Sequence, residues 1–125
     1  MSINFVSFGL ENVSYGGQLE TRKRRITFLY WEECQSHDEA LTRLRKVLRE
    51  DQIDAEIEVI KVRSDEEAKQ LGFTGSPTIL VDGRDIQPPT STHYALSCRA
   101  YQLEDGRISP LPSEPMIRTA LKRES

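Results

Sequence analysis

The chain has 125 residues, of which 37% are apolar and 30% are charged, with a formal net charge of −3. Such a chain can form one small domain that buries a core without disulfides or metals. The net charge argues against nucleic-acid binding, which requires a basic face. No run of about 18 apolar residues occurs that could span a membrane, and residues 1–10 lack the regions of a secretion signal. We therefore expect a cytoplasmic protein whose two cysteines stay reduced.

The first 25 residues are predicted to be an extension that precedes a domain over residues 26–125. Within the extension, Ile3–Phe8 contains enough apolar residues to add a strand. The domain opens with Ile26–Trp31, a β-branched and aromatic run that predicts a buried strand.

Two capping patterns predict where the first two helices of the domain begin. Ser36-His37-Asp38-Glu39 and Ser64-Asp65-Glu66-Glu67 each pair a serine with a glutamate three residues later, which satisfies free backbone N–H groups reciprocally. Apolar residues then recur at helical spacing after the first pattern: Leu41, Leu44, Val47 and Leu48. Between the helices Ala55–Val62 predicts a second strand, and Gly72 suits the end of the second helix.

The rest of the chain completes an α/β pattern. Thr78–Val81 predicts the third strand, Gly83–Tyr94 a long loop, Ala95–Leu103 the fourth strand, and Ser113 the start of the last helix. The element order is then β-α-β-α-β-β-α. A strand–helix–strand unit implies a parallel pair with a right-handed crossover, and the last two strands are expected to be antiparallel. The predicted fold is a mixed four-stranded sheet flanked by helices.

Two motifs in this pattern are similar to those of a known family. Gly75-Ser76-Pro77-Thr78 leads from a helix end into an apolar strand, and Trp31-Glu32-Glu33-Cys34-Gln35-Ser36-His37 places a cysteine between a strand and a helix. Together they resemble the thioredoxin and glutaredoxin superfamily, in which a cis-proline before a strand faces a cysteine at a helix start. The resemblance implies a thioredoxin-like fold with a cis Ser76–Pro77 bond. The chain departs from the family because Cys34-Gln35-Ser36-His37 stands where Cys-x-x-Cys is usual.

The resemblance also implies a site around Cys34. Cys34 and His37 are the expected catalytic residues, and Trp31, Ser76 and Pro77 are the expected substrate-binding residues. In the family, the residue before the cis-proline offers its backbone to an extended peptide, which is the role expected of Ser76. The thiolate is the reactive form of cysteine, and a helix N-terminus with a protonated His37 one turn on favours it. With a single cysteine in the motif, a mixed disulfide persists until another thiol arrives.

The predicted strand pairing argues against Cys98 as that other thiol. If Ala95–Leu103 pairs antiparallel with Thr78–Val81, Cys98 lies about three residues, roughly 10 Å, along the strand from Pro77. A disulfide needs Cα atoms within about 7 Å. We therefore expect Cys98 to be a buried core thiol that forms no disulfide with Cys34.

Three functions stay open, and whether the protein is an enzyme stays open with them. The first is monothiol thiol–disulfide exchange through Cys34, with protein or small-molecule thiols and disulfides as partners and no cofactor beyond glutathione as a thiol donor. The second is a redox-silent module that binds partners in the same groove. The third is a protein that handles soft metals or organomercurials, since thiolate and imidazole suit such ions. Cys34 and His37 are too few for a structural zinc site, so no metal ligands are predicted. The sequence indicates neither a substrate nor an oligomeric state.

Overall fold

The computed structural model describes residues 23–88 and 94–123. The strand expected at Ile3–Phe8, most of the N-terminal extension and part of the Gly83–Tyr94 loop lie outside the described residues. In chain order the elements are β1 (Arg24–Tyr30), α1 (Ser36–Glu50), β2 (Ala55–Lys61), α2 (Asp65–Leu71), β3 (Thr78–Val81), β4 (Arg84–Asp85), β5 (Tyr101–Gln102), β6 (Ile108–Ser109) and α3 (Glu114–Lys122). The first three strands and the three helices of this series begin within two residues of the predicted positions.

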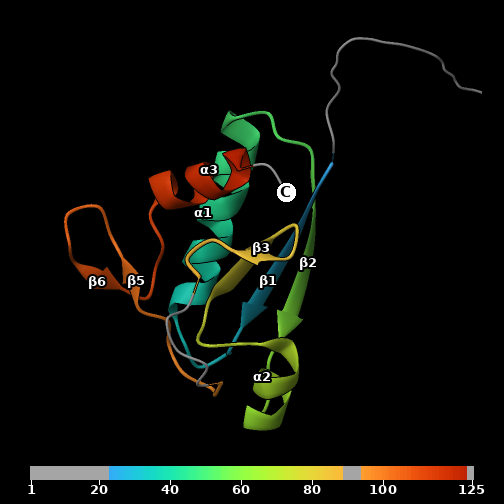
Figure 1. The fold of residues 1–125 in the computed structure, drawn as a ribbon, viewed down its shortest axis with the longest axis vertical. Coiled ribbons are helices and arrows are strands. Elements are labelled where there is room, and N and C mark those ends of the chain that lie inside the picture. The colour runs from blue at the N-terminus through green and yellow to red at the C-terminus, as the bar shows by residue number, and fades with distance from the viewer. Residues whose placement is uncertain (1–22, 89–93, 124–125) are drawn as a thin grey trace, which may run out of the picture.

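Four strands of the described residues form one mixed sheet in the order β2-β1-β3-β4 (Figure 1). β1 pairs in parallel with β2 and antiparallel with β3, and β3 pairs antiparallel with β4. The parallel pair is joined through α1, because parallel strands need a long crossover connection. The expected mixed α/β fold with a four-stranded sheet is confirmed.

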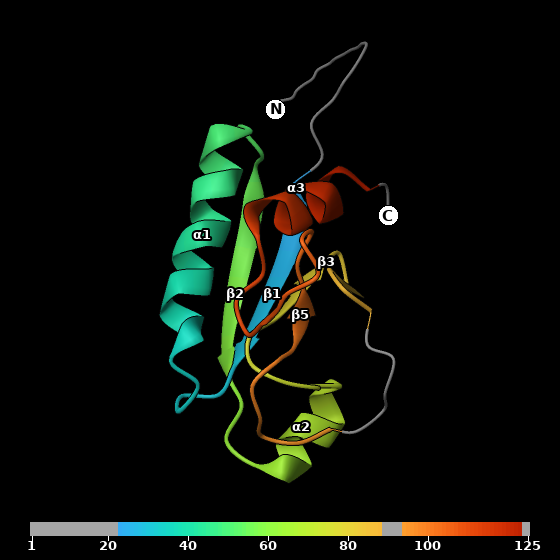
Figure 2. The same cartoon turned by 90° about the vertical axis from the view of Figure 1, so that its left-hand side faces the viewer.

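The helices pack on both faces of the sheet (Figure 2). Successive side chains of a strand point to opposite faces, so Phe28 and Leu29 of β1 enter different apolar clusters. Phe28 shares the main core with Leu44 of α1 and Ile117 of α3, whereas Leu29 packs with Ala68 of α2. α1 and α3 therefore cover one face and α2 covers the other. Within the described ranges, no helix combines the length and the apolar character that crossing a membrane takes.

The ends of α2 and the start of α3 follow the signals in the sequence. Ser64 caps α2 by accepting a hydrogen bond from the Glu67 backbone N–H at 3.1 Å. Gly72 ends the same helix in a left-handed conformation, with a φ of 70° that glycine adopts without steric cost. Ser113 caps α3 in the same way as Ser64, through the Met116 N–H at 3.2 Å. Local sequence is thus sufficient to place these helix ends.

The capping box expected at Ser36 is wrong. α1 begins at Ser36, no side chain caps it, and Gln35 before it already has right-handed helical backbone angles. The Cys34 carbonyl accepts the His37 N–H at 3.4 Å, so the first turn reaches back to Cys34. A serine inside that turn is not in the extended conformation from which an N-cap side chain reaches the backbone. Cys34 consequently lies at the N-terminal end of α1, as expected.

The fourth strand expected at Ala95–Leu103 is also wrong. β4 is Arg84–Asp85, directly after Asp82-Gly83. Asp82 and Gly83 have φ values of 51° and 85°, the conformation of a two-residue hairpin turn in which Asp-Gly is a preferred pair. The chain therefore turns back at once, and β4 takes the edge beside β3. Of the expected strand only Tyr101–Gln102 is a strand, and it pairs with β6 instead.

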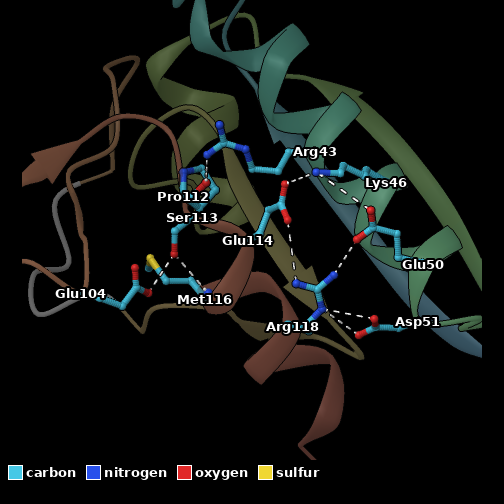
Figure 3. A network of polar contacts seen from close by, with 10 residues as sticks. All are labelled: Arg43, Lys46, Glu50, Asp51, Glu104, Pro112, Ser113, Glu114, Met116 and Arg118. Carbon is cyan, nitrogen blue, oxygen red and sulfur yellow. Dashed lines mark hydrogen bonds and ion pairs between the residues drawn. The ribbon is translucent and has the colours of Figure 1, made fainter.

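A row of ion pairs attaches α3 to α1 (Figure 3). Lys46 of α1 lies 2.7 Å from a carboxylate oxygen of Glu114, and Arg118 of α3 lies 2.8 Å from Glu50 and 3.0 Å from Asp51. The hydrogen bond from the Lys46 ammonium lowers the pKa of Glu114, since it favours the ionised carboxylate. These groups remain in contact with solvent, so they orient the helix more than they stabilise the fold.

We expect buried apolar contacts to dominate stability. Leu44 in α1 is fully buried, whereas Leu71 at the end of α2 is 39% exposed. Leu44→Ala should lower the free energy of unfolding by about 2–5 kcal/mol, because it removes buried surface and leaves a cavity. Leu71→Ala is the matched control and should cost less than about 1 kcal/mol. Urea unfolding followed by circular dichroism measures both, and equal losses would contradict this account of the core.

Candidate functional site

The loop between α2 and β3 forms one wall of the candidate site. Its Ser76–Pro77 peptide bond is cis, as expected, and both residues are fully buried. Ser76 Oγ accepts a hydrogen bond from the Trp31 backbone N–H at 3.0 Å. Thr78 Oγ1 donates to the Gly75 carbonyl at 2.6 Å. These bonds fasten the loop to the end of β1 and to the start of β3.

Cys34 lies against this loop, between the end of β1 and the start of α1. Its backbone N–H donates to the Trp31 carbonyl at 3.0 Å, and its thiol donates to the Ser76 carbonyl at 3.4 Å. The expected contact of Cys34 with the Pro77 loop is confirmed. The expected exposure is wrong, because Cys34 is only 2% exposed. The loop lies on one side of the thiol, and a second segment, Tyr94–Ala100, lies against it as well.

This second segment brings Cys98 to Cys34. The Ser76 N–H donates to the Ser97 carbonyl at 2.7 Å and the Arg99 N–H donates to the Ser76 carbonyl at 2.8 Å, which forms a parallel bridge between Ser76 and Cys98. The Sγ atoms of Cys34 and Cys98 are 2.9 Å apart, and both thiols are free. In Figure 2 the orange chain that follows the grey trace runs past α2 toward β5. Two cysteines 64 positions apart therefore share one site.

The expected separation of roughly 10 Å between Cys98 and the Pro77 loop is wrong. It assumed that Ala95–Leu103 lies beside β3, a place that β4 occupies. The segment instead pairs with Ser76, the second residue before β3. Cys98 is also exposed, which corrects the expectation of a buried core thiol.

The two thiols have different roles in the hydrogen bonds of the site. The Cys98 thiol donates to the Cys34 sulfur, and the Cys34 thiol donates to the Ser76 carbonyl. The hydrogen bond to Cys34, partial burial and the charge that the Cys34 sulfur can carry together raise the pKa of Cys98 to about 11. Since a raised pKa favours the protonated thiol, Cys98 keeps its proton at neutral pH although it is the exposed member of the pair.

The side chains of the other two expected residues, His37 and Trp31, contact groups other than the thiols. The His37 ring packs on Tyr30, with ring centroids 4.5 Å apart, and its Nδ1 lies 3.3 Å from Asp38 Oδ1. In the part of the chain that the structure describes, no hydrogen bond joins this ring to either sulfur. The Trp31 side chain packs at the edge of the smaller core cluster, which contains Phe73. Both rings therefore serve as packing around the site.

Cys98 is the site residue that sequence reasoning missed. The signal that could have found it is Asp82-Gly83, read as a two-residue hairpin turn rather than only as the end of a strand. A hairpin there fills the edge beside β3 with Arg84–Asp85. Residues near Cys98 are then free to pair elsewhere, although their pairing with Ser76 has no local signature.

The potential metal ligands at the site are the two sulfurs. Residues 23–88 and 94–123 hold no group of three or more His, Cys, Asp or Glu side chains that could share a metal ion. Two thiols suit a soft cation with few ligands, whereas a structural zinc ion takes about four.

Comparison with known protein families, curated proteins and solved structures gives no match to this chain. Function therefore has to be argued from the chemistry of the site, since a fold by itself does not specify one.

We expect the reactivity of Cys98 to report its contact with Cys34. With a pKa of about 11, the alkylation rate of Cys98 should rise about tenfold per pH unit up to pH 10, because only the thiolate reacts. Cys34→Ala removes the hydrogen bond and the neighbouring sulfur. The pKa of Cys98 should then fall toward its ordinary value, and its alkylation at pH 8 should rise on the order of tenfold or more. Iodoacetamide labelling followed by mass spectrometry measures both rates, and a wild-type profile that levels off near pH 9 would contradict the geometry.

Proposed function

We propose that this protein carries out thiol–disulfide exchange through a dithiol formed by Cys34 and Cys98. The observation that carries the proposal is the 2.9 Å separation of their sulfur atoms, because exchange requires one sulfur to attack another directly. The second thiol resolves the mixed disulfide that a single cysteine leaves on the protein. A two-cysteine function thus replaces the monothiol function expected from Cys34-Gln35-Ser36-His37.

A thioredoxin-like arrangement supports the proposal by analogy. The sheet order β2-β1-β3-β4, with β1 and β2 parallel and β4 antiparallel to β3, supports such a scaffold. The cis Ser76–Pro77 bond precedes β3, and the Ser76 carbonyl contacts Cys34 at the start of α1. This support concerns the scaffold, whereas the chemistry rests on the two sulfurs.

The exchange balances with partner thiols and needs no bound cofactor. In the oxidised protein a disulfide joins Cys34 and Cys98. A thiolate of a protein, or of a small molecule such as glutathione, attacks the Cys98 sulfur; the S–S bond breaks, and Cys34 leaves as a thiolate that takes up a proton. A second partner thiolate attacks the mixed disulfide and releases Cys98, which is protonated in turn. The protein gains two electrons and two protons, and two partner thiols become one disulfide.

Exposure gives the two sulfurs different roles. Cys98 is exposed and Cys34 is 2% exposed, so a partner attacks Cys98 and Cys34 is the thiol that leaves; in the reverse direction Cys34 resolves the mixed disulfide on Cys98. This order is the opposite of the one expected, in which Cys34 meets the substrate. The raised pKa of Cys98 leaves little thiolate on Cys98 at neutral pH. Attack on the oxidised protein uses the partner's thiolate instead, so the first step of accepting electrons does not depend on ionisation of Cys98.

We assign none of the remaining expected residues to substrate binding. Both backbone groups of Ser76 are bonded to Ser97 and Arg99, so a substrate peptide could pair with Ser76 only after that segment leaves. Pro77 is fully buried in the same loop. His37 takes no part in proton transfer in this exchange, because no hydrogen bond within the described residues joins its ring to either sulfur.

The test of this function is disulfide formation by the purified protein. In mixtures of reduced and oxidised glutathione, we expect the wild type to lose two hydrogens and both alkylatable thiols as the Cys34–Cys98 bond forms. Cys34→Ser should retain glutathione on Cys98 as a stable mixed disulfide. Cys98→Ser should accumulate little adduct, because Cys34 is buried. Mass spectrometry after acid quenching measures all three proteins.

Other outcomes of that experiment point to the other functions. A wild type that accumulates a stable glutathione adduct without an internal disulfide would favour the monothiol function through a single cysteine. A wild type that does not react at any glutathione ratio would favour a redox-silent binding module on the same scaffold. Either result would reject the dithiol.

A second candidate function is the binding of a soft cation such as copper(I) or mercury(II). The contact between the Cys34 and Cys98 sulfurs favours it, because two thiolates on one site are ligands that such ions select. We expect about one ion per reduced chain, with binding lost in Cys34→Ser and in the oxidised protein. Titration against a competing chelator measures the stoichiometry, and unchanged binding in Cys34→Ser would exclude this candidate.

A further inference from the structure

Cys98 lies on the segment Tyr94–Ala100, which belongs to no helix or strand in the described part of the chain. Its position therefore depends on the individual bonds that attach this segment. On the N-terminal side, the Leu96 N–H donates to Asp65 Oδ1 at 3.0 Å. On the C-terminal side Arg99, the residue after Cys98, is only 6% exposed. Arginine is rarely buried unless its charge is paired, so the partners of Arg99 identify what holds this side of the segment.

The Arg99 guanidinium joins the segment to the edge of the sheet. Its two terminal nitrogens each lie 3.1 Å from a carboxylate oxygen of Asp85 in β4, which is a paired, directional contact. One of them also donates to Thr78 Oγ1 in β3 at 3.3 Å, and the other donates to the Gln87 carbonyl after β4. Two neighbouring strands thus fix the orientation of the guanidinium plane.

Tyr101 extends this attachment to the cis-proline loop. The guanidinium carbon of Arg99 lies 4.9 Å from the centre of the Tyr101 ring, within the range of a cation–π contact. The Tyr101 hydroxyl donates to the Pro77 carbonyl at 2.6 Å. Burial raises the pKa of Tyr101, so this hydroxyl keeps the proton that it donates. Arg99 is therefore connected to the loop that contacts Cys34.

Gly75 allows the segment to approach this loop so closely. A Cβ atom on Gly75 would lie 2.9 Å from the Arg99 Cα and 3.0 Å from its backbone nitrogen, closer than a Cβ can approach backbone atoms without displacing them. The backbone next to Cys98 thus rests directly on the loop, and a small shift of Arg99 moves the Cys98 sulfur relative to Cys34.

We propose that Arg99 is a positioning residue for the thiol pair: its contacts with Asp85 and Tyr101 hold the Cys98 thiol in contact with Cys34. This role presupposes the proposed exchange function. A planar guanidinium fork suits the task, because it is bonded in one orientation and restrains the adjoining backbone. A lysine carries the same charge on a flexible stem and would restrain the backbone less.

The measurable quantity is the effective concentration of one thiol at the other. Joining sulfurs 64 positions apart closes a long loop, which costs entropy in a flexible chain. Contacts that hold the sulfurs together beforehand reduce this cost. Freeing the segment should therefore lower the equilibrium constant for disulfide formation, and a tenfold decrease corresponds to about 30 mV for this two-electron couple.

The experiment compares the stability of the disulfide in folded variants. Equilibration with glutathione, read by mass spectrometry, gives the constant for the wild type, Arg99→Gln and Arg99→Lys. We expect Arg99→Gln to lower it by about tenfold or more, and Arg99→Lys to lower it less, since the charge opposite Asp85 is kept. Arg118→Gln is the matched control: it also removes arginine ion pairs, but those between α1 and α3, and it should leave the constant unchanged.

A second readout separates positioning from general loss of stability. When Cys98 leaves Cys34, its pKa should fall from about 11 toward its ordinary value, and its alkylation at pH 8 should rise while circular dichroism stays native. If Arg99→Gln does not fold, both measurements on Arg99→Lys decide the question. Folded Arg99 variants with wild-type disulfide constants and alkylation profiles would overturn the role of Arg99 and leave the exchange function intact. A wild type that forms no Cys34–Cys98 disulfide would instead overturn the exchange function itself.

Discussion

The two hydrogen bonds between the Ser76 backbone and the Ser97–Arg99 segment are the contact on which the site depends. They attach an irregular stretch of chain to a loop that already contacts Cys34. Ser76 is fully buried, so removing the segment would leave its N–H without a partner and its carbonyl with the Cys34 thiol alone; an unpaired buried group costs about 1–3 kcal/mol. The segment is therefore part of the folded core although it belongs to no strand, and Cys98 is held beside Cys34 by the fold itself.

Residues at both ends of β3 contact the two segments that this contact joins. At its start, Ser76 contacts Trp31 at the end of β1 and Cys34. At its end, the Asp82-Gly83 turn returns the chain as β4 and presents Asp85 to Arg99. β3 thus connects the loop that contacts Cys34 to the strand whose Asp85 pairs with Arg99, the residue after Cys98. With the proposed role of Arg99, this connection links the two-residue β4 to a site that contains none of its residues.

The two thiols differ in exposure and in ionisation, and this difference decides which sulfur a partner attacks in the proposed exchange. The exposed sulfur is the donor in the hydrogen bond between them and keeps its proton to high pH, while the buried sulfur is the acceptor. A partner therefore meets the sulfur that is poorly ionised in the reduced protein but open to attack in the oxidised protein. In the proposed exchange, the first attack on the oxidised pair therefore needs no thiolate on Cys98, whereas attack by the reduced protein does. The same arrangement would let a soft cation displace both protons, which links the two candidate functions to one structural feature.

Sequence alone was enough for the first three strands, for the three helices and for the position of Cys34 before α1. Their signals act between residues a few positions apart: apolar periodicity, serine caps at Ser64 and Ser113, and a glycine after α2. It was not enough for the partner of Cys34. That partner depends on which segment takes the edge beside β3, and a tight turn at Asp82-Gly83 gave the edge to β4 and left Cys98 to pair with Ser76. Contacts between residues 64 positions apart are set by the register of packed elements, and a difference of a few residues in one turn moves a sulfur from out of reach to contact.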